Sequence, residues 1–352
     1  MELKPMSEHP DAEMRFVCGA ERSSPSGREF VFFANFAEEP AFEPYGHIYS
    51  YRPDRDEPWL FTDIESYIHT AVAGRLASTG SDFVFLMSTE GEFWALGEPG
   101  ASFGNTIEGA GYAWDHSEYG DIYAMSYALD RFGGVVFATG DNGQVYQLHE
   151  KEADWEQIGA NLLGRDDVAG QGVARASDGT LYLVARNKAA TNVPGKLYDT
   201  VLYAWHREGA WREVLTQPNE SIYAGPTALP DGRVAIGGRD GVVLAGTASD
   251  GFEQVTRPIS AQDMVALQSF QGTLYASNSA LLTLRGDQFV REQGGTPPLF
   301  DPEGREVGSN IVSTHLSIGG QALLSVGGFY GDIVRFDGTQ WERIVFPGRT
   351  MR

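Results

Sequence analysis

Three observations predict an all-β fold built from one repeated unit of four short strands. The 352 residues include 43 glycines, a composition that favours turns and strands over long helices. One hairpin pattern, consisting of a strand, a polar turn, an aromatic, two polar residues and an aliphatic, recurs along the whole chain. The 3.6-residue hydrophobic periodicity that helical repeats require is missing from the same segments.

The hairpin is clearest in RFDGTQWERI at 335–344, AWHREGAWREVL at 204–215 and QLHEKEADWEQI at 147–158. Each aromatic after the turn is expected to begin an outermost strand and to pack against the neighbouring repeat. A packing residue is needed in every repeat, whereas a binding residue would be special to one, so the aromatics are interpreted as core. Their average spacing is about 47 residues. The positions are Trp59, Phe103, Trp155, Trp211, Phe252, Phe289 and Trp341.

Two further signals precede each hairpin. A glycine turn leads into an apolar strand, as in DGTLYLVA and DGRVAIGG. Before the glycine comes a strand of small residues, such as DVAGQGVARA and SIYAGPTAL. Bulky side chains would collide where inner strands converge, so the small-residue strand is predicted to be the innermost.

Seven copies of this four-strand unit predict a seven-bladed β-propeller with four-stranded antiparallel blades in a single domain over 1–352. Two ring closures stay open: an N-terminal strand can complete the last blade, as in many propellers, or FVCGAERS, Phe16–Ser23, can serve as the inner strand of the first blade. In the second case the last blade, ending at 341–346, needs no borrowed strand. The predicted blades are 14–63, 64–108, 121–159, 167–216, 221–257, 262–294 and 309–347.

Two turns carry a resemblance to a known family. STEGEFW at 88–94 and FDGTQW at 336–341 resemble the Asp-box of sialidase-like propellers, Ser-x-Asp-x-Gly-x-x-Trp, although Glu90 directly precedes Gly91 and the second copy has no serine. The chain therefore resembles the β-propeller superfamily, sialidase-like or kelch-like. The Asp-box is a structural turn, so the resemblance implies a fold class and no particular activity. The Trp-Asp and Gly-His pairs of WD repeats do not recur.

The charge balance favours a basic partner. Lys and Arg number 26 against 48 Asp and Glu, which gives a formal net charge of −22. Such an excess repels phosphate backbones and anionic membranes, so neither direct nucleic-acid binding nor membrane binding is expected. Cys18 is the single cysteine, which excludes an intrachain disulfide. Residues 1–14 carry acids and no apolar core, and no run approaches the length of a membrane span, so neither a secretory signal nor a membrane segment is expected. A cytoplasmic monomer is expected.

The repeats differ in their loops. Insertions at 108–120, 159–166, 185–200 and 294–309 are all expected on one face of the propeller, the default place for binding. Acidic residues near the starts of inner strands and within the insertions make this face an electrostatic docking site or a merely solvated surface. The predicted binding residues are Trp114, Asp115, His116, Glu118, Tyr119, Asp121, Asp166, Asp167, Glu220, Asp263, Asp301 and Glu303.

Catalytic signals are weak. In YAWDHSEYGD at 112–121, His116 with Asp115 and Asp121 could hold a divalent cation, but no second histidine stands at ligand spacing. An aromatic-acidic recognition loop or an ordinary loop is the alternative. His69 and His315 fall on predicted inner strands and could point into the channel. No nucleophile elbow, phosphate-binding loop or zinc-protease motif occurs, so no metal, cofactor or catalytic residue is assigned.

Two functions from different classes remain open. The leading hypothesis is a non-enzymatic protein-binding propeller that docks a basic partner on its acidic face, for example an inhibitor or immunity protein that neutralises a toxin. The alternative is a glycan-binding protein or a hydrolase or lyase whose carboxylates act at the central channel.

Overall fold

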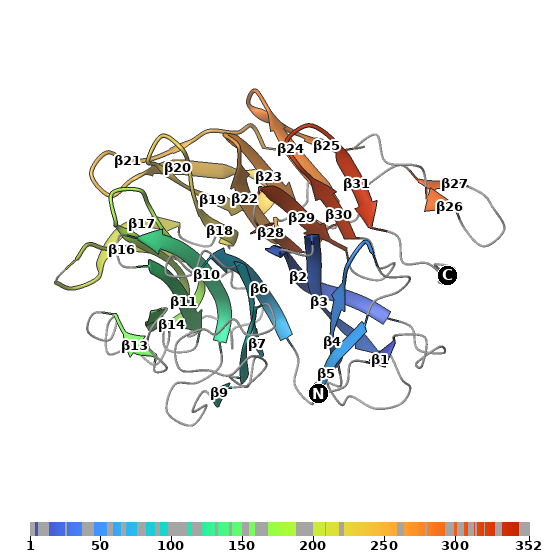
Figure 1. The fold of residues 1–352 in the computed structure, drawn as a ribbon. Coiled ribbons are helices and arrows are strands. Elements are labelled where there is room, and N and C mark those ends of the chain that lie inside the picture. The colour runs from blue at the N-terminus through green and yellow to red at the C-terminus, as the bar shows by residue number, and fades with distance from the viewer. Residues whose placement is uncertain are drawn as a thin grey trace, which may run out of the picture.

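The computed structural model describes residues 4–5, 14–24, 27–36, 46–54, 59–64, 68–75, 82–88, 92–97, 112–113, 122–130, 133–140, 143–149, 155–158, 168–187, 200–207, 209–217, 222–258, 264–278, 280–292, 299–300, 306–308, 313, 315–319, 321–327 and 333–344. Seven antiparallel sheets form the blades of a β-propeller, which confirms the predicted fold class (Figure 1). Within each blade the strands pair in sequence order, from the inner strand to the outer one.

The first three blades contain the following strands: β2 (Met14–Ser24), β3 (Gly27–Phe36), β4 (Gly46–Tyr51) and β5 (Trp59–Ile64); β6 (Ile68–Arg75), β7 (Asp82–Ser88), β8 (Glu92–Leu96) and β9 (Tyr112–Ala113); β10 (Ile122–Asp130), β11 (Gly133–Gly140), β12 (Val145–His149) and β13 (Glu156–Gln157). A short strand, β1 (Lys4–Pro5), adds a fifth member outside β5 in the first blade.

The next three blades contain β14 (Val168–Arg175), β15 (Leu181–Asn187), β16 (Thr200–Trp205) and β17 (Arg212–Gln217); β18 (Ile222–Ala228), β19 (Val234–Gly238), β20 (Val243–Thr247) and β21 (Gly251–Gln254); β22 (Ala266–Phe270), β23 (Thr273–Ser277), β24 (Leu281–Arg285) and β25 (Gln288–Arg291). The seventh contains β28 (His315–Gly319), β29 (Ala322–Val326), β30 (Ile333–Phe336) and β31 (Trp341–Ile344). A hairpin of β26 (Leu299–Phe300) and β27 (Glu306–Gly308) precedes it, and η3 (Arg239–Gly241) is the single helical turn among the described residues.

The ring closes without a shared strand, which is one of the two closures that the sequence leaves open. Strand β2 is the inner strand of the first sheet, and the last sheet is completed by its own β31. Strands β28 and β2 lie beside each other, and Ser317 donates a hydrogen bond of 2.8 Å to the carbonyl of Gly19 across this junction. Side-chain contacts between the first and last blades must therefore hold the ring shut.

The second blade differs from the prediction. Its fourth strand, β9, pairs with β8 and lies within the segment expected to be an insertion, 108–120. Phe103, the aromatic expected to begin this strand, lies outside the described residues. The long connection of this blade therefore runs from β8 to β9, which is possible because the entropic cost of closing a loop rises only slowly with its length.

Small residues on the inner strands are explained by close contacts between blades. A side chain carbon added at Gly172 of β14 would lie 1.9 Å from the carbonyl oxygen of Gly225 in β18. An added carbon at Gly319 would lie 1.9 Å from the carbonyl oxygen of Glu21. Neither distance is compatible with a Cβ atom, so glycine is required wherever neighbouring inner strands approach this closely.

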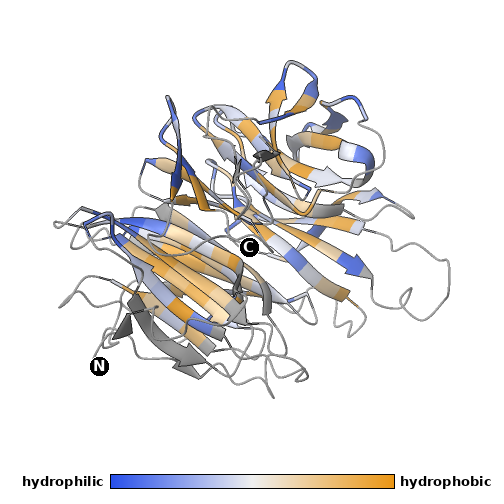
Figure 2. Cartoon of the chain, turned by 90° about the vertical axis from the view of Figure 1, so that its right-hand side faces the viewer, coloured by the Kyte–Doolittle hydropathy of each residue, from blue (hydrophilic) through white to orange (hydrophobic). Residues whose placement is uncertain are grey.

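Seven hydrophobic clusters fill the seven junctions between neighbouring blades. Apolar residues accordingly follow the strands, and hydrophilic residues gather at strand ends and turns (Figure 2). The predicted aromatics lie at these junctions wherever their side chains are described. They are Trp155, Trp211, Phe252, Phe289 and Trp341.

Trp211 and Trp341 show how the aromatics pack. Trp211 of the fourth blade is 8% exposed and donates an indole hydrogen bond of 3.2 Å to the carbonyl of Ile158 in the third blade. Trp341 is only partly buried; it stacks on Phe336 with ring centroids 4.6 Å apart and meets Tyr275 of the sixth blade edge-on. Both therefore act as packing residues between blades.

Candidate functional site

All twelve predicted binding residues lie outside the described residues. The structure does describe the strands to which they are joined, so the anchor of each can be stated. The residues are Trp114, Asp115, His116, Glu118, Tyr119, Asp121, Asp166, Asp167, Glu220, Asp263, Asp301 and Glu303.

Four acidic positions are joined to neighbouring inner strands. Asp121 directly precedes β10 and Asp167 directly precedes β14, while Glu220 stands two residues before β18. Asp263 directly precedes Met264, which is fully buried ahead of β22. Strands β10, β14, β18 and β22 are consecutive neighbours in the ring. Four adjacent inner strands are thus each preceded by an acidic residue in the sequence.

Asp301 and Glu303 belong to a different place. They fall in the connection of the β26–β27 hairpin. Figure 1 shows this hairpin at the outer edge of the molecule, away from the inner strands. The two residues are therefore not joined to the ring of inner strands that anchors Asp121, Asp167, Glu220 and Asp263.

The long connections divide unequally between the two faces. Successive antiparallel strands reverse direction, so the connections that join second to third strands emerge on the same face as those that join one blade to the next. We call this the loop-bearing face. Connections 37–45, 159–167, 188–199 and 292–314 emerge there, whereas 97–111, between β8 and β9, emerges on the opposite face. The predicted insertion 108–120 is thus divided by β9: 108–111 belongs to the opposite face, whereas 114–121, between β9 and β10, joins one blade to the next on the loop-bearing face. The prediction that every insertion shares one face is therefore wrong for 108–111.

The described inner strands place little charge at the channel. Glu21 is the one carboxylate on them whose side chain the structure describes. It forms an ion pair with Arg335, with Arg335 Nε 2.6 Å from Glu21 Oε2. His69 and His315 lie on β6 and β28, as predicted for inner strands. Among the described residues, no group of three His, Cys, Asp or Glu side chains is arranged to hold a metal ion.

A buried charged network at the first blade is satisfied internally. Arg22 donates to Glu29 at 2.5 and 3.0 Å and to the carbonyl of Leu96 in the second blade at 2.7 Å, and Ser50 donates to the other oxygen of Glu29. Arg22 and Glu29 pair within the first blade, and the hydrogen bond from Arg22 to the carbonyl of Leu96 is the contact that crosses to the second blade. Such a network ties two blades together and offers no free group for chemistry.

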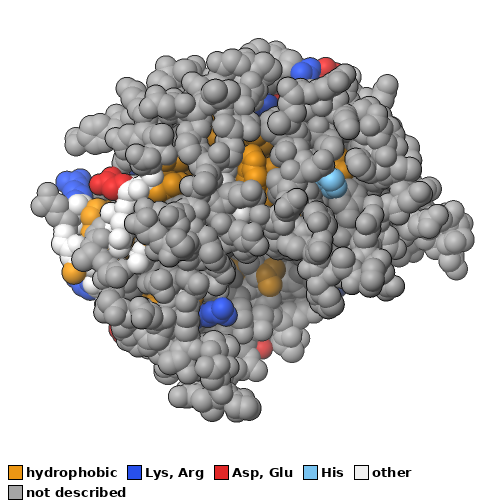
Figure 3. All heavy atoms as spheres, turned by 90° about the horizontal axis from the view of Figure 1, so that it is seen from below, with side chains coloured by type: hydrophobic (Ala, Val, Ile, Leu, Met, Phe, Trp, Pro, Cys, Tyr) orange, Lys and Arg blue, Asp and Glu red, His pale blue; other side chains and the backbone are white. Residues whose placement is uncertain are grey.

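Figure 3 shows one face of the molecule. In the face shown in Figure 3, described Asp and Glu side chains are few and separate, hydrophobic side chains are visible in hollows, and most atoms belong to residues outside the described ranges. In the part of the chain that the structure describes, no helix has the length and apolar character needed to cross a membrane.

Comparisons with known proteins show the fold alone. No protein-family model matches the chain, and no curated protein matches it. Among solved structures, a chain of the mitotic checkpoint complex is similar with a TM-score of 0.51 at 13% identity, covering 88% of this chain and 87% of that one. A chain of the nidogen/laminin complex has a TM-score of 0.47 at 12% identity, covering 79% and 92%. A gluconolactonase candidate has 0.43 at 14% identity, covering 78% and 88%.

Proposed function

We propose that this protein is a non-enzymatic propeller that binds a basic protein on its loop-bearing face. The supporting observation is the acidic residue before each of four adjacent inner strands, β10, β14, β18 and β22. Residues held one or two positions from neighbouring strands share one arc of one face, so their fields add. With a net charge of −22, such an arc attracts a basic surface and repels nucleic acid.

An inhibitor or immunity protein is the most concrete form of this proposal. A toxin that acts on nucleic acid has a basic active site that binds a polyanion. The acidic residues before β10, β14, β18 and β22 could bind that site in place of the nucleic acid. The partner would be met in the cytoplasm. Solved propellers within protein complexes are consistent with a protein partner in general.

The test is a pull-down from cytosolic extract with two charge-reversal variants of equal net charge. The first carries Lys at Asp115, Glu118 and Asp121. The matched control carries Lys at Asp54, Asp250 and Asp287, exposed acids on turns of the opposite face. The same basic protein should be retained by the wild type and the control, and lost by the first variant.

Salt provides the second arm of the test. The Debye screening length is about 8 Å at 0.15 M ionic strength, so retention of the partner should fall as the salt concentration rises beyond that value. The proposal is refuted if the wild type retains no basic protein at low salt. It is also refuted if both variants retain the same partner equally well.

A further inference from the structure

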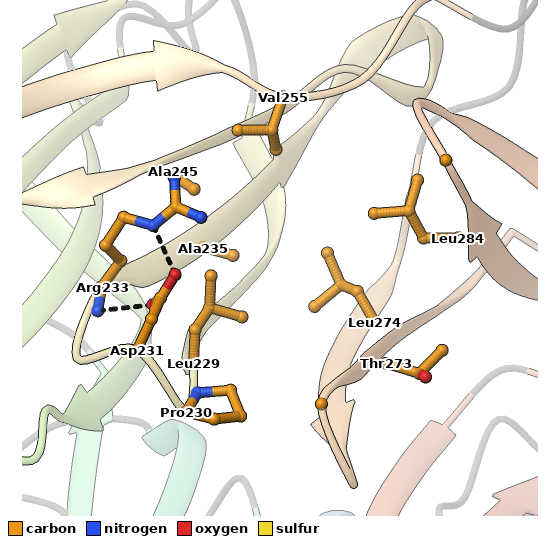
Figure 4. A pocket seen from close by; sticks show the side chains of 12 residues that line it. Leu229, Pro230, Asp231, Arg233, Ala235, Ala245, Val255, Thr273, Leu274 and Leu284 are labelled. Carbon is orange, nitrogen blue, oxygen red and sulfur yellow. Dashed lines mark hydrogen bonds and ion pairs between the residues drawn. The ribbon is translucent and has the colours of Figure 1, made fainter.

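One pocket lies on the face opposite the loop-bearing face, between the fifth and sixth blades. It has a volume of about 520 Å³, within the range of ~300–1,000 Å³ usual for small-molecule sites. Figure 4 shows the fifth-blade wall on one side and Thr273, Leu274 and Leu284 of the sixth blade on the other. The apolar walls come from Leu229, Ala235, Ala245, Val255, Leu274 and Leu284.

At the pocket the fifth blade lacks an aromatic that its neighbours carry at the equivalent position. The turns before β15 and β19 share the same hydrogen bonds, with Gly179 donating to Ala176 and Gly232 donating to Leu229, so Tyr182 and Ala235 occupy equivalent positions. Counting from the left-handed glycine of the sixth-blade turn gives Tyr275 as the third equivalent. The fifth blade therefore carries a methyl group where the fourth and sixth carry a phenol ring.

The missing ring has a defined role in the other two blades. Tyr182 contacts Phe252 of the fifth blade edge-on at 6.3 Å, and Tyr275 contacts Trp341 of the seventh in the same way at 6.3 Å. The sixth blade supplies the corresponding aromatic, Phe289, which is buried in the same cluster as Ala235. Half of an aromatic pair is thus present, and at the position of the other half the fifth blade has only Ala235, which lines the pocket.

The mouth of the pocket carries excess negative charge. Arg233 donates to Asp231 at 2.8 Å and lies 3.5 Å from Glu253, so one guanidinium faces two carboxylates. Both oxygens of Asp231 accept hydrogen bonds from Arg233, but Asp231 and Glu253 remain 52% and 77% exposed, so a cation can approach either carboxylate from solvent. Hydrogen bonds from the backbone and side chain of Arg233 lower the pKa of Asp231, so its carboxylate stays ionised. An anionic ligand would have to displace two carboxylates from Arg233.

We propose that this pocket binds a small aromatic amine, whose ring lies against Leu274 and Leu284 and whose ammonium group pairs with Asp231 in the lining and with Glu253 beside Arg233. Ring burial against Leu274 and Leu284 supplies the apolar part of the affinity, and the carboxylates select the cation over an anion of the same shape. This site is separate from the protein-binding face proposed above.

The probe is tyramine, which carries the phenol ring of Tyr182 and Tyr275 on a short amine. Binding is measured by saturation-transfer NMR and calorimetry at low salt. Two matched compounds separate ring from charge: 3-(4-hydroxyphenyl)propionate has the ring with the opposite charge, and n-butylamine has the charge without the ring. Tyramine should bind at least tenfold more tightly than either. Equal binding of the propionate, or no binding of tyramine, overturns the proposal.

Variants locate the site. Ala235→Tyr restores the ring that the neighbouring blades carry and should abolish tyramine binding. Val290→Tyr, which adds the same ring at an exposed position of the sixth blade, should leave binding unchanged. Glu253→Gln should weaken binding about two- to fivefold, as expected for one exposed charge.

A folding control keeps the test decisive. If Ala235→Tyr fails to melt cooperatively, Ala245→Leu fills the pocket from the adjacent strand and should abolish binding in its place. Tyramine binding that survives in a folded, filled variant refutes this pocket as the site.

Discussion

A buried ion pair contributes to closure of the ring, and replacing Arg335 with Leu should measure that contribution. Arg335 of β30 pairs with Glu21 of β2 at 2.6 Å, and their side chains are 12% and 3% exposed. Arg28 and Glu342 form a second, more exposed pair of 2.6 Å across the same junction. Since no strand is shared between the first and last blades, these contacts and the cluster around them hold the ring closed.

The expected loss of stability in Arg335→Leu is about 3–5 kcal/mol near pH 7, because the variant leaves the Glu21 carboxylate buried without its partner. The effect depends on pH. Burial raises the pKa of Glu21 above its ordinary value of 4.5, and the hydrogen bond and charge of Arg335 lower it again in part. Removing Arg335 therefore raises this pKa further. Arg28 still lowers it and Glu342 still raises it.

The sign follows from proton linkage. A group whose pKa is higher in the folded than in the unfolded state contributes stability below its unfolded pKa, and that stability is lost as pH rises through the folded pKa. The deficit of the variant relative to wild type should therefore be smallest near pH 4.5 and grow as pH rises. It grows by about 1.4 kcal/mol for each unit by which the substitution raises the pKa.

Urea unfolding followed by tryptophan fluorescence, at several pH values from 5 to 8, measures this deficit. The control is the double variant Glu21→Gln, Arg335→Leu, which has no buried carboxylate at this place. It should be more stable than the single variant at pH 7 and show no growing deficit. A deficit equal at pH 5 and pH 8, or a double variant no more stable than the single one, would refute the reasoning.

Three further outcomes are expected. Trp211→Ala should lower the free energy of unfolding, measured by urea titration, by about 3–5 kcal/mol, and Trp341→Ala should lower it by less because Trp341 is only partly buried. Neither variant should change partner specificity. A larger loss for Trp341→Ala than for Trp211→Ala would contradict the packing described. Gly172→Ala should prevent or strongly weaken folding, seen as a lower melting temperature, because the added carbon meets the carbonyl oxygen of Gly225. Cys18 is fully buried, and burial raises the pKa of its thiol, so a thiol reagent should label it only on unfolding; rapid labelling of the native protein would disprove this.

Local repetition made the fold predictable. A blade is a run of hairpins between strands that are neighbours in sequence, so turn chemistry and alternation specify most of its pairing. The aromatic after each turn could be interpreted as core because Trp211 and Trp341 recur at equivalent places. The second blade shows where this fails, since the copy around Phe103 is the weakest and its fourth strand lies further along, at Tyr112–Ala113.

Contacts between distant residues required the tertiary structure. Nothing near Glu21 in the sequence indicates that its partner is Arg335, because the two residues meet only when the first and last blades come together. The pocket also required the tertiary structure, although part of it can be traced in the sequence. Its signal is visible in DGTLY, DGRVA and QGTLY, where Ala235 replaces a tyrosine, yet a small residue is no sign of a cavity until the neighbouring blade is seen to leave the space open. Periodicity reports what each repeat shares, whereas a site arises from the side chains that face one another across blades.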